Sequence, residues 1–257
     1  MAKYFDLTGR VAIVTGCSTG LGVQMAKALA AQGATIVAMA RRQNLIEEVA
    51  KDIHDEFGVD TLAVRCDITD TENVDSAVKT VLEKFGRIDI LINNAGTGAV
   101  APAEDITDEQ FANEMNIDLF GTFKVARAVA KYAMIPAKYG RIINIASMYG
   151  LVGNKQLGSS PYHAAKGGVV NLTRALAGEW GKYNITVNAI CPGYFYTPLT
   201  QATLDTPEFQ AYAKASIPSE RYGHEGELDT AAIFLAAEES SYVNGIMVPV
   251  DGGYTCI

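Results

Sequence analysis

Short apolar runs rich in valine and isoleucine alternate along the chain with longer segments in which apolar residues recur at helical spacing. Seven of the runs have the length and composition of strands buried on both faces: residues 11–15, 35–40, 61–66, 88–93, 141–146, 185–190 and 246–250. Helical spacing is clearest in residues 22–33, 73–86 and 167–180. Strands that alternate with helices predict right-handed crossovers, and therefore a parallel sheet covered by helices on both faces.

The alternation of strands and helices runs without a break that would mark a domain boundary. No linker rich in proline or serine, no charge block and no change of composition interrupts it, so we expect one domain over residues 1–257. The longest departure from the pattern is residues 192–226, which hold four prolines. Long irregular insertions often act as lids or binding loops, and this segment is therefore expected to be a substrate loop.

Composition and charge narrow the class of protein. Apolar residues make up 49% of the chain and charged residues 19%, as in a folded domain. The 21 basic and 29 acidic residues give a net charge of −8 without a basic stripe, which disfavours a nucleic-acid partner. No apolar run is long enough to cross a bilayer, and the start of the chain lacks the pattern of a secretion signal. We therefore expect a cytoplasmic protein without a membrane partner.

The cysteines and histidines are few and scattered. The 4 cysteines lie far apart without a CxxC pair, which predicts reduced thiols and no disulfide framework. None of the 3 histidines stands at metal-ligand spacing from another histidine or a cysteine. We therefore expect no metal site.

A glycine-rich turn, TGCSTGLG, follows the first expected strand and opens the first helix. Its glycines allow a tight turn and a close approach of the backbone to a pyrophosphate, and the helix N-terminus supplies unpaired N–H groups. A tight turn that binds nothing is the alternative. The cofactor contacts expected from this turn are Gly16, Ser18, Thr19, Gly20, Leu21 and Gly22.

Two arginines follow the second expected strand, where a dinucleotide fold meets the adenosine ribose. An acidic residue there would bind the ribose 2′-hydroxyl, whereas Ala40 does not, and Arg41 can pair with a 2′-phosphate. This favours NADP over NAD. Thr19 adds no second cation within the glycine turn, so NAD stays possible, and Arg41 and Arg42 can alternatively be solvated charges at a helix start.

The third and fourth expected strands end in residues suited to a ligand crevice, because the carboxyl ends of parallel strands form that crevice. Asp67 can accept a hydrogen bond from an adenine amino group or, alternatively, cap the following helix. The motif NNAG, residues 93–96, keeps small residues next to the fourth strand. The cofactor contacts expected from these strand ends are Asp67, Ile68, Asn94, Ala95 and Gly96.

Three further motifs follow: Ser147 after the fifth strand, Tyr162-His-Ala-Ala-Lys166, and Pro192-Gly193 after the sixth strand. With all these motifs, the chain resembles the short-chain dehydrogenase/reductase family over essentially its whole length. The resemblance implies a single doubly wound Rossmann-type domain, with a seven-stranded parallel sheet and helices on both faces. It also implies an NAD(P)-dependent oxidoreductase that acts on a secondary alcohol or ketone, and a homotetramer.

The residue types suit that chemistry. A free tyrosine has a pKa of about 10, but a nearby ammonium and a positively charged cofactor favour a phenolate. Tyr162 is expected to exchange a proton with the substrate oxygen as hydride moves, and Lys166 lies on the same helix face. Ser147 is expected to hold the substrate oxygen in place.

The resemblance extends to further positions. It implies that Asn116 holds a water near the lysine and completes a catalytic set with Ser147, Tyr162 and Lys166, although a helix-interior asparagine bound to backbone is the alternative. Pro192, Gly193 and Thr197 are expected to contact the cofactor, and the resemblance implies that Thr197 lies near the nicotinamide carboxamide, with the backbone of Ile190 beside the same ring.

The segment between Ser147 and Tyr162 is longer than the family's commonest spacing, which should alter the wall of the substrate pocket. Ser159 and Ser160 also precede the tyrosine. We assign Ser147 as the catalytic serine because NIAS directly ends a predicted strand.

Residues 179–200 are similar to the branch of the family that contains gluconate 5-dehydrogenases and related sugar-acid or polyol oxidoreductases. A 3-oxoacyl-carrier-protein reductase and a hydroxysteroid dehydrogenase are alternatives. The first is disfavoured because Tyr132 and Gly178 stand where those enzymes commonly have basic residues. A non-catalytic NADP-binding regulator is a further alternative, disfavoured by the intact catalytic residues. The substrate contacts expected are Ser147, Tyr149, Asn154, Tyr162 and Tyr194.

Overall fold

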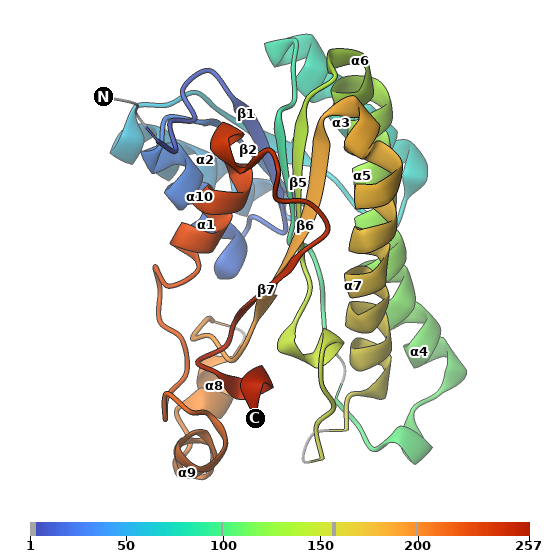
Figure 1. The fold of residues 1–257 in the computed structure, drawn as a ribbon, viewed down its shortest axis with the longest axis vertical. Coiled ribbons are helices and arrows are strands. Elements are labelled where there is room, and N and C mark those ends of the chain that lie inside the picture. The colour runs from blue at the N-terminus through green and yellow to red at the C-terminus, as the bar shows by residue number, and fades with distance from the viewer. Residues whose placement is uncertain (1–3, 99, 156–157, 199) are drawn as a thin grey trace.

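The computed structural model describes residues 4–98, 100–155, 158–198 and 200–257, and Figure 1 shows its fold. In these residues seven strands pair in parallel, in the order β3-β2-β1-β4-β5-β6-β7. The sheet predicted from the apolar runs is confirmed. Its strands are β1 (Val11–Thr15), β2 (Thr35–Ala40), β3 (Thr61–Arg65), β4 (Ile90–Asn93), β5 (Gly140–Ile145), β6 (Ile185–Pro192) and β7 (Met247–Val250).

The strand order reverses at the centre of the sheet. The chain runs outward from β1 to β3, then returns to place β4 beside β1 and continues outward to β7. In a doubly wound sheet the ligand crevice opens at this reversal, outside the carboxyl ends of the strands. The glycine turn follows β1 and the NNAG motif follows β4, so both lie at this crevice.

Helices cover both faces of the sheet (Figure 1). One apolar core joins one face to α1 (Leu21–Ala31), α2 (Gln43–Phe57) and α10 (Asp229–Ala236). A second core joins the other face to α3 (Thr71–Phe85), α5 (Thr122–Val129) and α7 (Ser160–Trp180). Successive residues of a strand point to opposite faces, and accordingly Val11 and Ile13 belong to one core while Ala12 and Val14 belong to the other.

Between β4 and β5 the chain forms one long helical stretch interrupted by two π-helical segments. It consists of α4 (Asp108–Met115), η2 (Asn116–Gly121), α5, η3 (Ala130–Met134) and α6 (Ile135–Ala137). A Cβ on Gly121 would lie 2.6 Å from Cδ1 of Ile68, so η2 approaches the end of β3 closely. Single π turns inside helices are frequent at functional sites.

The helix α7 begins at Ser160, seven residues before the start indicated by apolar spacing. Its first turns carry polar residues, which hide the helical period, and Pro161 near the helix start suits an N-terminus. Tyr162 and Lys166 therefore both lie on α7, one turn apart.

The segment at residues 192–226 contains two short helices, α8 (Gln201–Leu204) and α9 (Pro207–Ser216). It has a small apolar core of its own, formed by Leu204, Phe209, Ala213 and Ile217. Tyr254, near the end of the chain, packs against this core. The expected irregular loop is thus a small packed subassembly, and its role as a lid remains a prediction.

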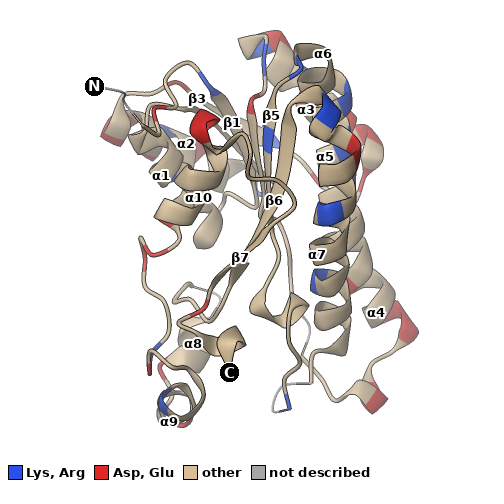
Figure 2. Cartoon of the chain, in the orientation of Figure 1, with Lys and Arg blue, Asp and Glu red and all other residues tan. Residues whose placement is uncertain are grey.

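Charged residues of both signs are spread over the helices and loops (Figure 2). No helix in the described part of the chain is long and apolar enough to cross a membrane. Among the same residues, no group of three His, Cys, Asp or Glu side chains is placed to hold a metal ion.

Candidate active site

The turn between β1 and α1 requires glycine at several positions. Gly16 and Gly20 have φ angles of +66° and +64°, which disfavour other residues. A Cβ on Gly22 would lie 2.6 Å from both Nδ2 of Asn94 and the carbonyl oxygen of Gly16. The turn is therefore packed directly against the end of β4.

Asn94 holds this turn in place. Its Nδ2 donates to the carbonyl oxygens of Thr15 at 3.0 Å and Gly16 at 3.3 Å. The Thr15 hydroxyl oxygen in turn accepts from the N–H groups of Asn94 and Ala95, each at 3.0 Å. The helix α1 begins after Gly20 without a side-chain cap, which leaves its first N–H groups available for an anion.

The segment after β6 contacts the glycine turn. A Cβ on Gly20 would lie 3.5 Å from Cβ of Thr197, an ordinary contact, so Thr197 lies against the glycine turn. Pro192 is the last residue of β6, and a Cβ on Gly193 would lie 2.7 Å from Cα of Asp251. The structure thus brings Thr197 to the predicted cofactor crevice and places Pro192 and Gly193 at a neighbouring strand end.

Both predicted arginines follow the carboxyl end of β2 and are exposed. Arg42 donates from its guanidinium to the Ser18 hydroxyl at 2.7 Å, which joins it to the glycine turn. The backbone oxygen of Arg41 accepts from Nε of Arg65 at 3.3 Å. Thr19 is exposed beside this group.

The carboxylate of Asp67 accepts from the Thr69 amide at 2.9 Å and the Thr69 hydroxyl at 2.7 Å. These bonds hold the pKa of Asp67 below its usual range. The alternative that Asp67 caps the next helix is wrong, because Asp70 is the N-cap of α3. Ile68 is buried with its side chain against Gly121, so only its backbone remains for a cofactor.

Lys166 joins α7 to the end of β5. Its side chain is buried, and Nζ donates to the carbonyl oxygen of Ile145 at 3.0 Å, two residues before Ser147. A Cβ on Gly150 would lie 2.7 Å from the backbone oxygen of Lys166. The turn that carries Ser147 therefore packs directly on α7 at Lys166.

Tyr162 lies half-buried one helical turn before Lys166, whose Nζ is 5.5 Å from the centre of the tyrosine ring. The loop after β4 covers the ring, since a Cβ on Gly98 would lie 3.8 Å from Cδ2 of Tyr162. The Ser147 oxygen accepts from the Tyr149 amide at 3.1 Å, which leaves the hydroxyl hydrogen free to donate elsewhere.

Ser159 has a different setting from Ser147. It precedes α7, and its hydroxyl lies 3.1 Å from Nδ1 of His163. The ring of His163 stacks on Tyr149 with 4.6 Å between ring centres. Ser159 and His163 thus support the wall of the site, which agrees with the assignment of Ser147 as the serine at the strand end.

Asn116 is not brought to Lys166. Its Oδ1 accepts from Nζ of Lys124 at 3.3 Å, and the same Nζ donates to the backbone oxygen of Thr69 at 2.6 Å, in the turn between β3 and α3. The expectation that Asn116 lies beside Lys166 is therefore wrong. In the π-helical segment the side chain two residues later, Asp118, faces the site.

Asp118 was missed by the sequence analysis. It is fully buried, and its Oδ1 accepts from the Thr97 amide at 2.8 Å. A Cβ on Gly96 would lie 2.6 Å from this Oδ1 and 3.3 Å from Nζ of Lys166. The only available sequence signal was a lone acidic residue within an otherwise apolar part of a helix.

Three of the predicted substrate residues form one hydrogen-bonded cluster. The Tyr149 hydroxyl bonds the Tyr194 hydroxyl and accepts from Nδ2 of Asn154. Tyr254 meets the rings of Tyr149 and Tyr194 edge-on, with ring centres 6.3 Å and 6.1 Å apart. Burial raises the pKa of Tyr149 and of Tyr194, so both stay protonated. One of the two hydroxyl hydrogens is used in their mutual bond, and the other can donate to a ligand.

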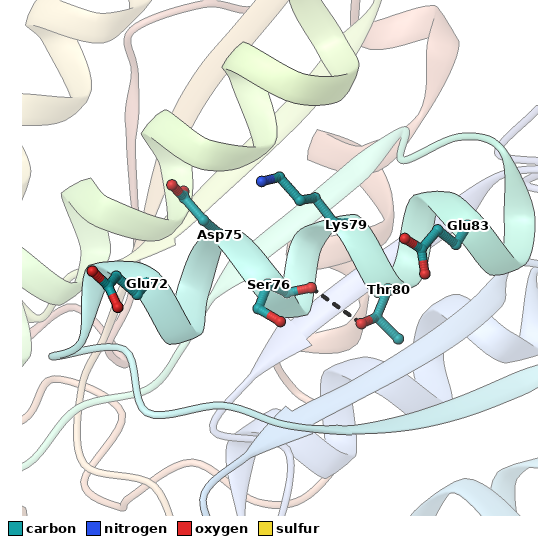
Figure 3. Close-up of a pocket in the computed structure, with 6 residues that line it drawn as sticks. All are labelled: Glu72, Asp75, Ser76, Lys79, Thr80 and Glu83. Carbon is teal, nitrogen blue, oxygen red and sulfur yellow. Dashed lines mark hydrogen bonds between the residues drawn. The ribbon is translucent and has the colours of Figure 1, made fainter.

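Two cavities lie outside the crevice. A shallow depression of 410 Å³ runs along α3 between residues 72 and 83, and Figure 3 shows that its side chains all come from that one helix. With no opposing wall it is a poor ligand site. A smaller cavity of 170 Å³ lies behind Tyr194, between the segment after β6 and the end of β7.

Comparison with known proteins agrees with this geometry. A family model described as enoyl-(acyl carrier protein) reductase matches residues 16–255. Gluconate 5-dehydrogenase of Gluconobacter oxydans is 37% identical over 98% of this chain and 96% of its own length. D-threitol dehydrogenase of Mycolicibacterium smegmatis is 39% identical, over 98% and 95%.

A solved gluconate 5-dehydrogenase from Burkholderia cenocepacia, in complex with NADP and tartrate, superposes with a TM-score of 0.94 at 37% identity. The match covers 99% of this chain and 98% of that one. The crevice, the strand-end serine and the Tyr162–Lys166 turn therefore belong to an oxidoreductase, and the chain is a member of the short-chain dehydrogenase/reductase family.

Proposed function

We propose that this chain transfers hydride between NADP and a secondary alcohol or ketone of a sugar acid or polyol. One observation carries the proposal: Lys166 is bonded to the end of β5, with Tyr162 one turn away and the Ser147 turn packed on its backbone. A lysine, a tyrosine and a serine at the crevice of a doubly wound sheet form a proton-transfer site.

The residues of the crevice fit a dinucleotide. A side chain has no room at Gly16 or Gly22, and the positive φ of Gly20 favours glycine there, which suits close approach of a pyrophosphate to the backbone. The nicotinamide, when bound, accepts or supplies the hydride. The other residues proposed to line the cofactor are Ser18, Thr19, Leu21, Asp67, Ile68, Asn94, Ala95, Gly96, Pro192, Gly193 and Thr197.

The preference for NADP is supported by the arginines after β2. Arg42 is already bonded to Ser18 of the glycine turn, and Arg41 is exposed next to it. A 2′-phosphate carries a negative charge that guanidinium groups bind well. Solved relatives named as gluconate 5-dehydrogenases contain NADP, which supports the same preference.

The chain's own residues supply the proton chemistry. In reduction, Tyr162 gives the proton of its hydroxyl to the substrate oxygen as the carbonyl carbon gains hydride, and in oxidation it takes that proton back. The buried Lys166 ammonium stabilises the negative charge left on the phenol oxygen. Ser147 donates a hydrogen bond to the same substrate oxygen and fixes its position.

The substrate class is proposed from residues that follow Ser147 and β6. Tyr149, Asn154 and Tyr194 present a hydrogen-bonded set of polar groups on an aromatic surface. Such a surface suits the several hydroxyl groups of a sugar acid or polyol, and the names of the relatives indicate the same chemistry.

The test is a substrate screen that follows nicotinamide absorbance with NADPH and NADH. Sugar acids, polyols, 3-oxoacyl thioesters, steroids and their keto forms are compared at equal concentration. The proposal expects the highest kcat/KM with a polyhydroxylated substrate. Higher kcat/KM with a 3-oxoacyl thioester or a steroid would contradict the substrate class, and binding of NADPH without any turnover would favour a regulator.

We also propose that the segment 192–226 closes over the substrate. The contact between Thr197 and Gly20 supports closure of the segment on the crevice.

We further propose that the protein is a cytoplasmic homotetramer. Exposed aromatic side chains at Phe111, Phe120 and Tyr242 support subunit interfaces. Light scattering of the purified protein tests the tetramer.

A further inference from the structure

The feature that the mechanism above leaves unused is the carboxyl group of Asp118. The side chain is fully buried in the π-helical segment η2. Its Oδ1 accepts from the Thr97 amide at 2.8 Å, and its Oδ2 has no hydrogen-bond partner among the residues that the structure describes. Burial of a carboxyl oxygen without a hydrogen-bond donor costs free energy, which a nearby group can offset by stabilising its charge.

Lys166 is the nearby group that can do so. Its Nζ and Oδ1 of Asp118 both lie within 3.3 Å of the point where a Cβ on Gly96 would stand. One Nζ hydrogen is used by Ile145, and an ammonium has three. Both groups therefore border the same point of the site, and opposite charges that are buried near each other attract because water screens them little.

The other ionisable groups around Asp118 come from three helices. Lys166 faces it from α7, where Tyr162 lies one turn earlier, and Glu114, also buried, lies one turn before Asp118 on α4. Lys124 of α5 points elsewhere, since its Nζ donates to the backbone of Thr69 and to Asn116. Lys166 is therefore the cation that Asp118 faces within the described residues.

We infer that Asp118 is ionised in the working enzyme. Because its negative charge lies close to Lys166, Tyr162 keeps its proton to a higher pH than it would with a neutral amide at position 118. The inference rests on the proposed function, because it assigns Tyr162 the proton transfer. The ammonium of Lys166 stabilises a phenolate, and a carboxylate beside that ammonium offsets part of this stabilisation. Asp118 is thus a positioning residue that acts through Lys166 and sets the pH range of the enzyme.

The test compares wild type with Asp118→Asn, which keeps an oxygen to accept from the Thr97 amide but removes the charge. The measured quantity is kcat/KM as a function of pH, in both directions of the reaction. In the variant, the acidic limb of the profile for alcohol oxidation and the basic limb of the profile for ketone reduction should both move to lower pH, by about one unit. Both limbs move together because they report the same proton on Tyr162. Limbs that stay in place would show that Asp118 is neutral or only structural, and would overturn the inference.

Controls separate the local charge from other effects. Asp108→Asn makes the same change of net charge at an exposed position of α4 and should leave both limbs in place. Asn116→Ala tests the alternative residue: a shift there without a shift in Asp118→Asn contradicts the inference. If Asp118→Asn does not fold, Asp118→Ser offers a smaller neutral side chain, for which the same direction is expected.

A readout independent of turnover is the ultraviolet absorbance of tyrosinate in the protein without cofactor. Subtraction of the Tyr162→Phe titration isolates the signal of Tyr162, and its midpoint should fall by about one unit in Asp118→Asn. An unchanged midpoint contradicts the inference even if the enzyme turns over no sugar acid or polyol. Failure of the substrate screen and failure of the Asp118 inference are therefore distinguishable.

Discussion

The ammonium nitrogen of Lys166 lies 3.0 Å from the carbonyl oxygen of Ile145, and this bond joins α7 to the carboxyl end of β5. The turn after β5 also meets α7 at Gly150, where a Cβ would lie 2.7 Å from the backbone oxygen of Lys166. The distance between the serine turn and the Tyr162 helix is therefore set by the absence of a side chain at Gly150.

Gly150→Ala should separate the serine turn from α7 and shift Ser147 relative to Tyr162. Because misplacement by about 1 Å can cost about 100-fold in rate, we expect kcat/KM to fall by about 10–100-fold. Steady-state kinetics measure the effect. Gly153→Ala is the matched control in the same loop, since a Cβ there meets nothing within 4 Å, and equal losses in both variants would contradict the argument.

Gly22→Ala should weaken cofactor binding. The added Cβ would lie 2.6 Å from Asn94 and from the carbonyl oxygen of Gly16, so the glycine turn has to move. We expect the Kd for NADPH to rise by about ten-fold or more, as measured by fluorescence titration. In Gly178→Ala on α7 the Cβ meets nothing within 4 Å, so this variant should keep the Kd and gain about 0.5–1 kcal/mol in unfolding free energy.

Arg41→Ala and Arg42→Ala should each reduce the preference for NADPH over NADH by about ten-fold, because a charge-assisted hydrogen bond to phosphate contributes about 1.5–3 kcal/mol. The ratio of kcat/KM with the two cofactors is the measurement. Lys51→Ala removes an exposed cation of α2, the helix that follows the two arginines, where Lys51 pairs with Asp55. A preference that changes equally in all three variants would mean that net charge, and not 2′-phosphate recognition, is responsible.

The pair of Arg221 and Glu227 predicts a pH dependence of stability in the segment after β6. The Arg221 guanidinium, with the His224 amide, lowers the pKa of Glu227 from 4.5 to about 2. A lowered pKa stabilises the fold above pH 4.5, and this contribution is lost as the pH falls towards 2.

Glu227→Gln should therefore lower the melting temperature at neutral pH only slightly, by about 1–3 °C, because the pair is exposed. Thermal unfolding of both proteins as a function of pH gives the comparison. The difference between them should shrink as the pH is lowered, and a difference that grows in acid would contradict the assignment.

Apolar spacing was sufficient to predict the sheet and most of its helices. Buried parallel strands are continuous apolar runs, and the order of strands and helices leaves few topologies. Apolar spacing alone gave too late a start for α7, because its first turns carry Tyr162, His163 and Lys166, which obscure the helical period. The spacing of Tyr162 and Lys166 did place these two residues on one helix face.

The site was predictable where glycines or strand ends fix it, and less so inside a helix. Asn116 and Asp118 lie two residues apart, and only the π-helical segment decides which of them faces Lys166. The bonds from Asn94 to the glycine turn and the cluster around Tyr149 join residues far apart in sequence. Such contacts depend on packing, which the pattern of a single chain does not specify.

The substitution Tyr162→Phe tests the central claim most directly. It removes the hydroxyl that exchanges the proton and keeps the ring that packs beside Gly98. General acid–base catalysis contributes about 100- to 10,000-fold, so kcat should fall by at least about 100-fold while the Kd for NADPH stays within about two-fold of wild type. Turnover equal to that of wild type, with the same substrate and cofactor, would contradict the account.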